Sequence, residues 1–77
     1  MSVFEQVRTA AADVLQVAPQ KLTASTTPDQ IEAWDSVQHL NLILALETQF
    51  GIEFEPEEIE RMKSIGDIVS LVEAKAG

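Results

Sequence analysis

The chain has 77 residues, of which 13 are acidic and five are basic, so its formal net charge is −8. A field of this sign repels nucleic acid and anionic lipid and attracts proteins with basic faces. The absence of cysteine excludes a disulfide framework and a thiolate metal site. No apolar run approaches the ~20 residues that cross a bilayer, and because the N-terminus has no basic region followed by an apolar core, we expect no signal peptide. We therefore expect one soluble, cytoplasmic, monomeric domain over residues 1–77, with no nucleic-acid partner.

The first helix is predicted over residues 2–16. Ser2 followed by Glu5 matches a capping box, and Pro19 cannot continue a helix. Apolar residues recur between these limits at helical spacings of three and four, which indicates one buried stripe: Val3, Phe4, Val7, Ala11, Val14 and Leu15.

A long loop is predicted over residues 17–34. Its middle is rich in turn-forming residues, namely Thr23, Ser25, Thr26, Thr27, Pro28 and Asp29. Loops longer than ~12–15 residues are uncommon in compact domains and are often functional. Because Leu22, Ile31 and Trp34 are apolar, we expect this loop to pack on the helices.

The second helix is predicted over residues 36–50. Asp35 or Ser36 can cap its start, and Gly51 suits the left-handed residue that often ends a helix. Its expected apolar face consists of Val37, Leu40, Ile43, Leu44 and Phe50, widened by Leu42 and Leu46.

The remaining segment predicts a linker and two more helices. Residues 52–55 alternate as a strand would, but no partner strand exists in the sequence, so a linker is expected. Pro56 favours the first turn of a short helix that runs to about Met62. A last helix begins at Ser64 or Ile65, frays at Lys75 and Gly77, and buries Ile65, Ile68, Val69, Leu71 and Val72. The fold class is therefore all-α: a small four-helix bundle with a short third helix.

The segment IEAWDSVQHL, residues 31–40, carries the most functional information. Asp35-Ser36-Val37 opens the second helix after the long loop, in a short, acidic, helical chain. With this layout, the sequence resembles the acyl carrier protein family over nearly its whole length. The runs 42–47 and 50–54 and the apolar spacing of 59–72 are also similar to that family.

The resemblance implies that a separate phosphopantetheinyl transferase attaches phosphopantetheine from coenzyme A to Ser36, between Asp35 and Val37. The terminal thiol of the arm then carries acyl groups as thioesters. A serine at a helix start is accessible to a partner, and unpaired backbone N–H groups there favour a phosphate. The alternative is that Ser36 or Asp35 is only a helix cap.

The resemblance also implies docking and pocket residues. Acyl-loading and acyl-transferring enzymes with basic faces are expected to contact Asp35, Gln38, Asn41, Glu47, Glu53 and Glu57. An acyl chain is expected among Leu40, Leu46, Ile59, Met62, Ile68 and Leu71, which otherwise form ordinary core. Val37 stands where the family usually has leucine, and Gln38 and Asn41 stand where acids are common. These departures favour a specialised lipid, polyketide or secondary-metabolite pathway over general fatty-acid synthesis.

Other functions compete with this reading. A D-alanyl or other aminoacyl carrier stays open, although the glycines usual before the serine of peptidyl carriers are replaced by Ala33-Trp34-Asp35. An unmodified acidic interaction bundle also stays open.

Ser36, His39 and Asp35 supply the members of a catalytic triad, but consecutive residues at an exposed helix end provide no water-excluding pocket. We therefore expect no catalysis, with His39 facing solvent or a partner. The acidic run over 53–60 lacks the pattern of an EF-hand, so we expect no dedicated metal site. The initial Met1 favours a free-standing protein.

Overall fold

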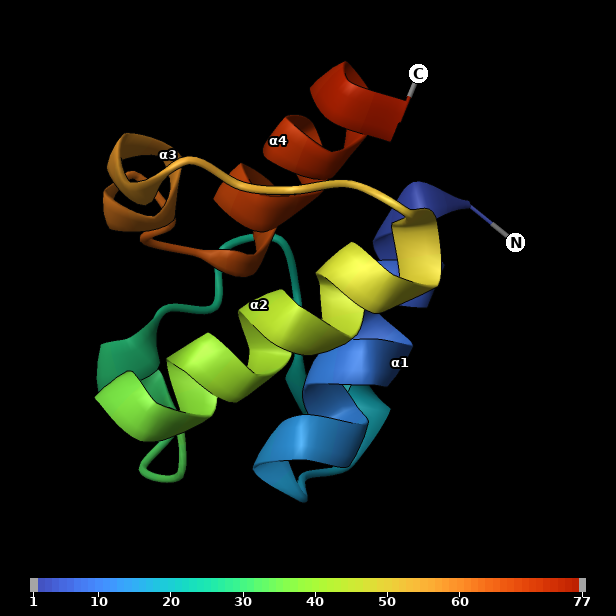
Figure 1. Cartoon of the computed structure of the whole chain (residues 1–77). Helices are drawn as coiled ribbons and strands as arrows, with labels where there is room; N and C mark the ends of the chain where they lie inside the picture. The colour runs from blue at the N-terminus through green and yellow to red at the C-terminus, as the bar shows by residue number, and fades with distance from the viewer. Residues whose placement is uncertain (1, 77) are drawn as a thin grey trace.

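The computed structural model describes residues 2–76 and is all-helical over that range, with no strand (Figure 1). The elements are α1 (Val3–Leu15), the 3₁₀ turns η1 (Pro19–Lys21) and η2 (Pro28–Gln30), α2 (Ser36–Phe50), α3 (Pro56–Glu60) and α4 (Ile65–Ala76). The predicted four-helix class and the linker over 52–55 are confirmed. The predicted fraying at Lys75 is wrong, because α4 includes that residue; Gly77 lies outside the described residues.

Local capping explains where α1 and α2 begin and end. The Ser2 hydroxyl accepts the backbone N–H of Glu5 at 3.1 Å, and the Glu5 carboxylate accepts the N–H of Ser2 at 3.3 Å. This backbone hydrogen bond from Ser2 is the main reason that the pKa of Glu5 is lowered from its ordinary value of 4.5. α1 ends on Gln16, which is left-handed at φ 60°, and α2 ends on Gly51 at φ 66°, a conformation that glycine adopts readily.

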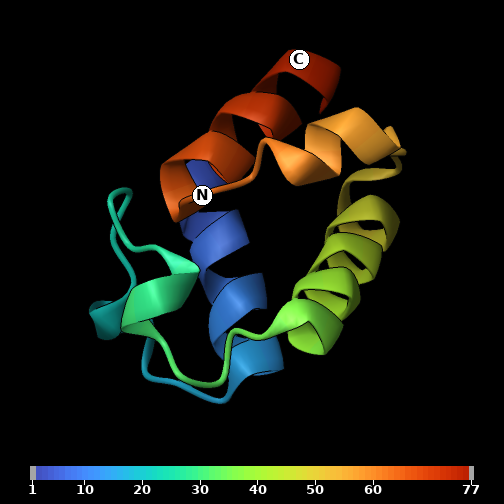
Figure 2. The same cartoon turned by 90° about the vertical axis from the view of Figure 1, so that its left-hand side faces the viewer.

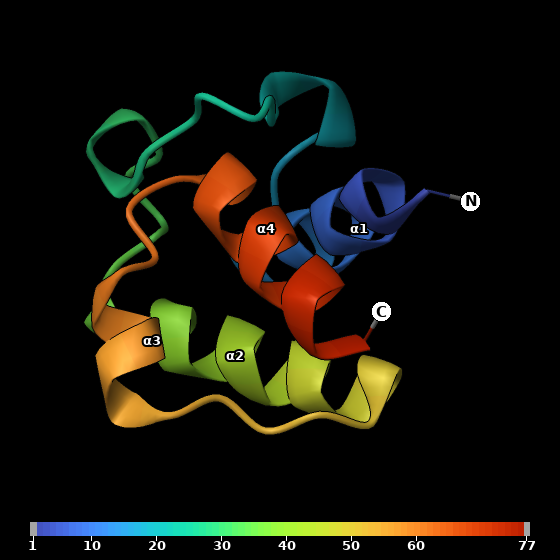
Figure 3. The same cartoon turned by 90° about the horizontal axis from the view of Figure 1, so that it is seen from above.

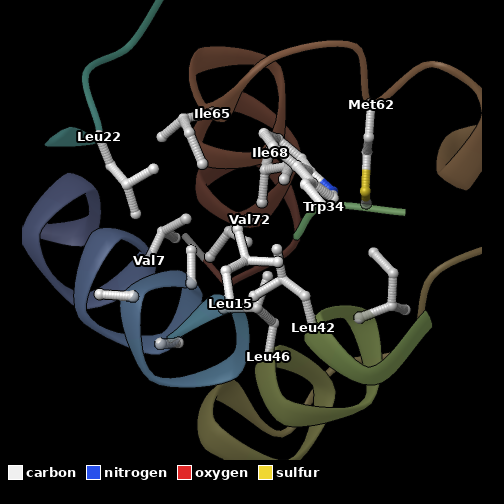
Figure 4. Close-up of a cluster of buried hydrophobic side chains, with 14 of the residues drawn as sticks. Val7, Leu15, Leu22, Trp34, Leu42, Leu46, Met62, Ile65, Ile68 and Val72 are labelled. Atoms are coloured by element: carbon white, nitrogen blue, oxygen red, sulfur yellow. The ribbon is translucent and has the colours of Figure 1, made fainter. Parts of the chain in front are cut away.

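The core forms where α1 packs against both α2 and α4. Two perpendicular views show the long loop on one side of α1 and α2 on the other (Figures 2 and 3). The largest fully buried side chains come from α1, the loop, α2 and α4 (Figure 4): Val7, Leu15, Leu22, Leu42, Leu46, Ile65, Ile68 and Val72. Ala10, Ala11 and Ala12 are also buried on α1, and their small volume lets the neighbouring helices approach closely.

The loop between α1 and α2 is packed, as its apolar residues predict. Leu22 and Trp34 are buried, and Ile31 packs against the core. Two backbone hydrogen bonds join the loop to the start of α4: Ile65 donates to the carbonyl of Thr26 at 3.0 Å, and Gly66 donates to that of Ala24 at 2.8 Å. The loop therefore has a fixed course and delivers residues 34–36 to a defined place.

Gly66 is expected to be a sensitive position in this junction. A Cβ at Gly66 would lie 2.9 Å from the carbonyl oxygen of Ala24, closer than real Cβ contacts allow. Gly66→Ala must push the loop away from α4 and strain both hydrogen bonds, so we expect a loss of about 1–3 kcal/mol in the free energy of unfolding. Urea denaturation followed by circular dichroism measures this loss.

Gly51→Asn provides the matched control for this substitution. Nothing lies within 4 Å of a Cβ at Gly51, and asparagine tolerates the left-handed conformation better than other side chains do. If Gly66→Ala unfolds at the same urea concentration as the wild type, the close approach of α4 to Ala24 is not maintained in solution.

The apolar face predicted for α2 requires a correction. The buried residues are Leu42, Ile43 and Leu46, whereas Val37, Leu40 and Leu44 are 65%, 54% and 60% exposed. α2 has more apolar residues than one buried stripe requires, so periodicity alone offers two neighbouring faces. Packing against α1 selects one of them and leaves the other in solvent.

An ion pair joins α3 to the last turn of α4. The Lys75 ammonium lies 2.9 Å from the Glu58 carboxylate and 5.9 Å from the centre of the Phe54 ring. The Glu58 carboxylate also accepts the backbone N–H of Glu55 at 2.7 Å. That backbone hydrogen bond, with a smaller contribution from Lys75, lowers the pKa of Glu58 from its ordinary value of 4.5.

Candidate functional site

The start of α2 presents an accessible serine. Asp35 is the cap: its carboxylate accepts the N–H of Gln38 at 2.9 Å, and its carbonyl accepts the N–H of His39 at 2.8 Å. Ser36 is the first helical residue and is exposed. Within residues 2–76, its hydroxyl forms no hydrogen bond. Since Asp35 caps the helix, Ser36 is not needed for that role.

The surroundings of Ser36 fit a phosphodiester. The backbone N–H groups of Ser36 and Val37 precede the first intrahelical hydrogen bond and have no acceptor in the described part of the chain. They lie at the positive end of a 15-residue helix, which favours an anion. A phosphopantetheine joined to the Ser36 hydroxyl would therefore place its phosphate beside unpaired donors.

The role of Asp35 as a cap leads to a direct prediction. Asp35→Ala removes the acceptor for the Gln38 N–H, and we expect a loss of about 1 kcal/mol in the free energy of unfolding. Asp35→Asn keeps an oxygen at the same place and should unfold close to the wild type. Urea titration of the three proteins measures both differences. Equal stability of the alanine and asparagine variants would contradict the capping role.

A cavity of about 360 Å³ opens beside Ser36, and we call it the Ser36 cavity. It is lined by Pro28, Trp34, Asp35, Ser36, His39, Leu40 and Met62. η2, the end of the loop, the first two turns of α2 and the segment after α3 thus meet at one place. The long loop and the serine, which are separate features in the sequence, belong to the same site.

The structure divides the six residues predicted to hold an acyl chain. Leu40 and Met62 line the Ser36 cavity. Leu46 and Ile68 are fully buried in the core, and Ile59 and Leu71 are partly buried against it. These four do not line the cavity, because the space between the helices is filled by side chains.

The sequence predicted that His39 faces solvent or a partner, but in the structure its ring contacts Trp34. It is half-buried, and its Nδ1 accepts the indole N–H of Trp34 at 3.0 Å. The two rings are stacked, with centroids 6.0 Å apart and planes inclined by 27°. Sequence reasoning missed this contact. The available signal was Trp34, since a buried indole N–H generally needs an acceptor nearby.

The residues predicted for docking lie in two environments. Asp35, Glu53 and Glu57 are exposed. Glu47 is half-buried and its carboxylate accepts the N–H of Phe54 at 2.9 Å, so it also fixes the linker. The side-chain amide of Asn41 donates a hydrogen bond to the amide oxygen of Gln38 at 3.0 Å. The two residues form a neutral polar pair on the surface of α2.

Val37, Leu40 and Leu44 form the α2 ridge, an exposed apolar stripe that begins next to Ser36. They are the exposed large apolar side chains of residues 2–76, and all three lie on this one helix. Exposed apolar groups gathered in one place commonly mark a surface that contacts another molecule.

The described residues contain no group of three or more His, Cys, Asp or Glu side chains arranged to hold a metal ion. Within the same range, every helix is too short or too polar to span a bilayer.

Comparison with known proteins is consistent with this geometry. A family model described as "Phosphopantetheine attachment site" matches residues 5–72. An acyl carrier protein of Clostridium acetobutylicum is 40% identical over 73 residues, covering 94% of each chain. One of Thermosynechococcus vestitus is 33% identical over 73 residues, covering 95% of this chain and 90% of its own.

A solved structure shares the fold as well. The solution NMR structure of the holo acyl carrier protein of Geobacter metallireducens superposes with a TM-score of 0.87 at 33% identity, covering 97% of this chain and 86% of that one. The sequence match, the fold and the exposed serine agree, and the chain belongs to the acyl carrier protein family, whose members carry a covalently attached phosphopantetheine.

Proposed function

We propose that Ser36 is the attachment residue and that the chain, as a single domain over residues 1–77, carries acyl intermediates for enzymes that act on them. The observation that carries this proposal is the environment of the hydroxyl. Ser36 is exposed, follows the Asp35 cap, lies beside two unpaired N–H groups and borders the Ser36 cavity. No other serine among residues 2–76 lines that cavity.

The chain's own residues then hold the arm and leave the chemistry to partner enzymes. The attached arm supplies a terminal thiol that bears acyl groups as thioesters. Ser36 would provide the anchoring oxygen, the unpaired N–H groups of Ser36 and Val37 would be available to the phosphate, and the Asp35 cap keeps the helix start in place. No hydrogen bond joins Ser36 to His39 within the described residues, so the nucleophile–base contact of a triad is not formed there.

Partner enzymes are proposed to approach along α2, beside the arm. After Ser36, the surface of α2 consists of the apolar α2 ridge and the neutral Gln38–Asn41 pair, and the exposed carboxylate of Asp35 lies directly before Ser36. The acids Glu47, Glu53 and Glu57 lie farther along the chain. Apolar contact along α2, with Asp35 before the serine and the other acids farther along the chain, favours a partner with an apolar patch inside a basic rim. This arrangement supports a specialised pathway.

The test is the intact mass of the purified chain after incubation with coenzyme A, magnesium and a broad-specificity phosphopantetheinyl transferase. We expect the mass to increase by a single phosphopantetheine, and fragmentation to locate it on Ser36. A folded chain that gains no mass would overturn the proposal in favour of an unmodified interaction bundle. A gain located on another serine would overturn the assignment of Ser36.

A further inference from the structure

One wall of the Ser36 cavity is formed by a large, buried aromatic side chain. Trp34 is 4% exposed and forms part of the lining, together with Met62, which is also 4% exposed. Trp34 belongs to the same buried cluster as Ile68, and the close-up shows its indole directed toward Ile68 (Figure 4). Ile68 and Leu46, which lie deeper, are fully buried and do not line the cavity. Trp34 thus stands between the cavity and the centre of the bundle.

His39 holds this indole in place. Tryptophan N–H can only donate, so the 3.0 Å hydrogen bond requires an unprotonated Nδ1 on His39. The bond satisfies a buried donor that would otherwise be costly to bury, and the stacked rings add contact area. Trp34 and His39 therefore form one unit, which we call the Trp34–His39 pair.

Met62 and Trp34, the two buried residues of the cavity wall, differ in how easily their side chains can move. Met62 is flexible and adapts to irregular space. Trp34 is rigid, and moving it out of the way would expose a large apolar ring and break its hydrogen bond to His39. A chain entering from Ser36 can therefore displace Met62 more readily than it can pass Trp34.

We infer that the Trp34–His39 pair limits the length of acyl chain that this carrier shelters, so that a short chain fits the Ser36 cavity and a long chain extends over the outer surface. The inference rests on the proposed attachment at Ser36. It makes Trp34 a residue that determines cargo specificity and His39 a positioning residue for it.

The test compares the wild type with Trp34→Leu after loading each with butanoyl, octanoyl or dodecanoyl phosphopantetheine from the matching acyl-coenzyme A. The first readout is the rate at which hydroxylamine cleaves the thioester, since a sheltered chain is cleaved more slowly. In the wild type, we expect the octanoyl and dodecanoyl forms to be no better protected than the butanoyl form. In Trp34→Leu, we expect the two longer chains to be cleaved several-fold more slowly.

The second readout is the NMR spectrum of the Ile68 and Leu46 methyl groups. In the wild type, these signals should stay in place when the dodecanoyl chain is attached, and in Trp34→Leu they should shift. The same measurement on His39→Leu and His39→Gln tests the positioning role. Glutamine retains an acceptor for the indole N–H, so His39→Gln should behave as the wild type does, while His39→Leu should resemble Trp34→Leu. The fluorescence of Trp34, the single tryptophan, reports whether the indole stays buried in both His39 variants.

Two results would overturn the inference, and only the second of them would also overturn the proposed attachment at Ser36. If a dodecanoyl chain in the wild type is protected and shifts Ile68 as strongly as in Trp34→Leu, the length limit is refuted while the attachment at Ser36 stands. If none of the acyl groups can be loaded on the wild type, the proposed attachment fails and the inference fails with it. Should Trp34→Leu not fold, His39→Leu provides the same comparison with the indole retained.

Discussion

Ser36→Ala is expected to abolish loading by a phosphopantetheinyl transferase while leaving the fold intact. Attachment forms a phosphodiester through the side-chain oxygen at position 36, and alanine has no such oxygen. The wild type should gain the mass of one phosphopantetheine, and the variant should gain none. The readout is intact mass after equal incubation with coenzyme A, magnesium and the enzyme.

The structure explains why this substitution should be harmless to folding. The cap of α2 is Asp35, and the Ser36 hydroxyl forms no hydrogen bond within residues 2–76. Alanine is a strong helix former, so the free energy of unfolding should stay within about 0.5 kcal/mol of the wild type. An unfolded variant would therefore contradict the assigned cap.

Ser70→Ala is the matched control for loading. Ser70 is also an exposed serine on a helix, but it lies on α4 and does not line the Ser36 cavity. The Ser70→Ala protein should be loaded as completely as the wild type. If Ser36→Ala still gains the arm and Ser70→Ala does not, the attachment residue is on α4.

The helices and their ends were predictable because local chemistry determines them. The capping box at Ser2, the cap at Asp35, Pro56 in the first turn of α3 and the left-handed Gly51 each act over a few residues. The packed state of the long loop also followed from its apolar residues. The 3₁₀ turns η1 and η2 were not predicted, although a proline opens each of them, because proline is equally common in irregular loops.

What periodicity left undetermined was the rotation of α2. An apolar residue can face either the core or a partner, and the choice depends on α1, which lies far away in the sequence. The same limitation explains why four of the six residues predicted to hold an acyl chain do not line the Ser36 cavity. Leu46 and Ile68 are apolar, as the wall of an acyl pocket would be, but both are fully buried among the side chains of the core. Trp34 and His39 lie on either side of the helix start, and only the folded loop brings their rings into contact.

Leu46→Ala is expected to destabilise the protein strongly. Leu46 is 0% exposed in the centre of the bundle, and truncating a buried leucine typically costs about 2–5 kcal/mol, because a cavity adds to the lost apolar burial. Small domains are stable by only ~0.05–0.15 kcal/mol per residue. The loss should therefore be a large share of the total, and it appears as a lower midpoint in urea or thermal unfolding followed by circular dichroism.

Leu44→Ala, two residues earlier on α2, makes the comparison decisive. Leu44 is 60% exposed on the α2 ridge, and alanine suits a helix at least as well as leucine does. Its stability should change by no more than about 0.5 kcal/mol. Because the two substitutions delete the same atoms from the same helix, their difference isolates the rotation of α2. Equal losses would mean that Leu44 also packs in the core, as the apolar pattern alone suggests, and that the exposed ridge beside Ser36 does not exist in solution.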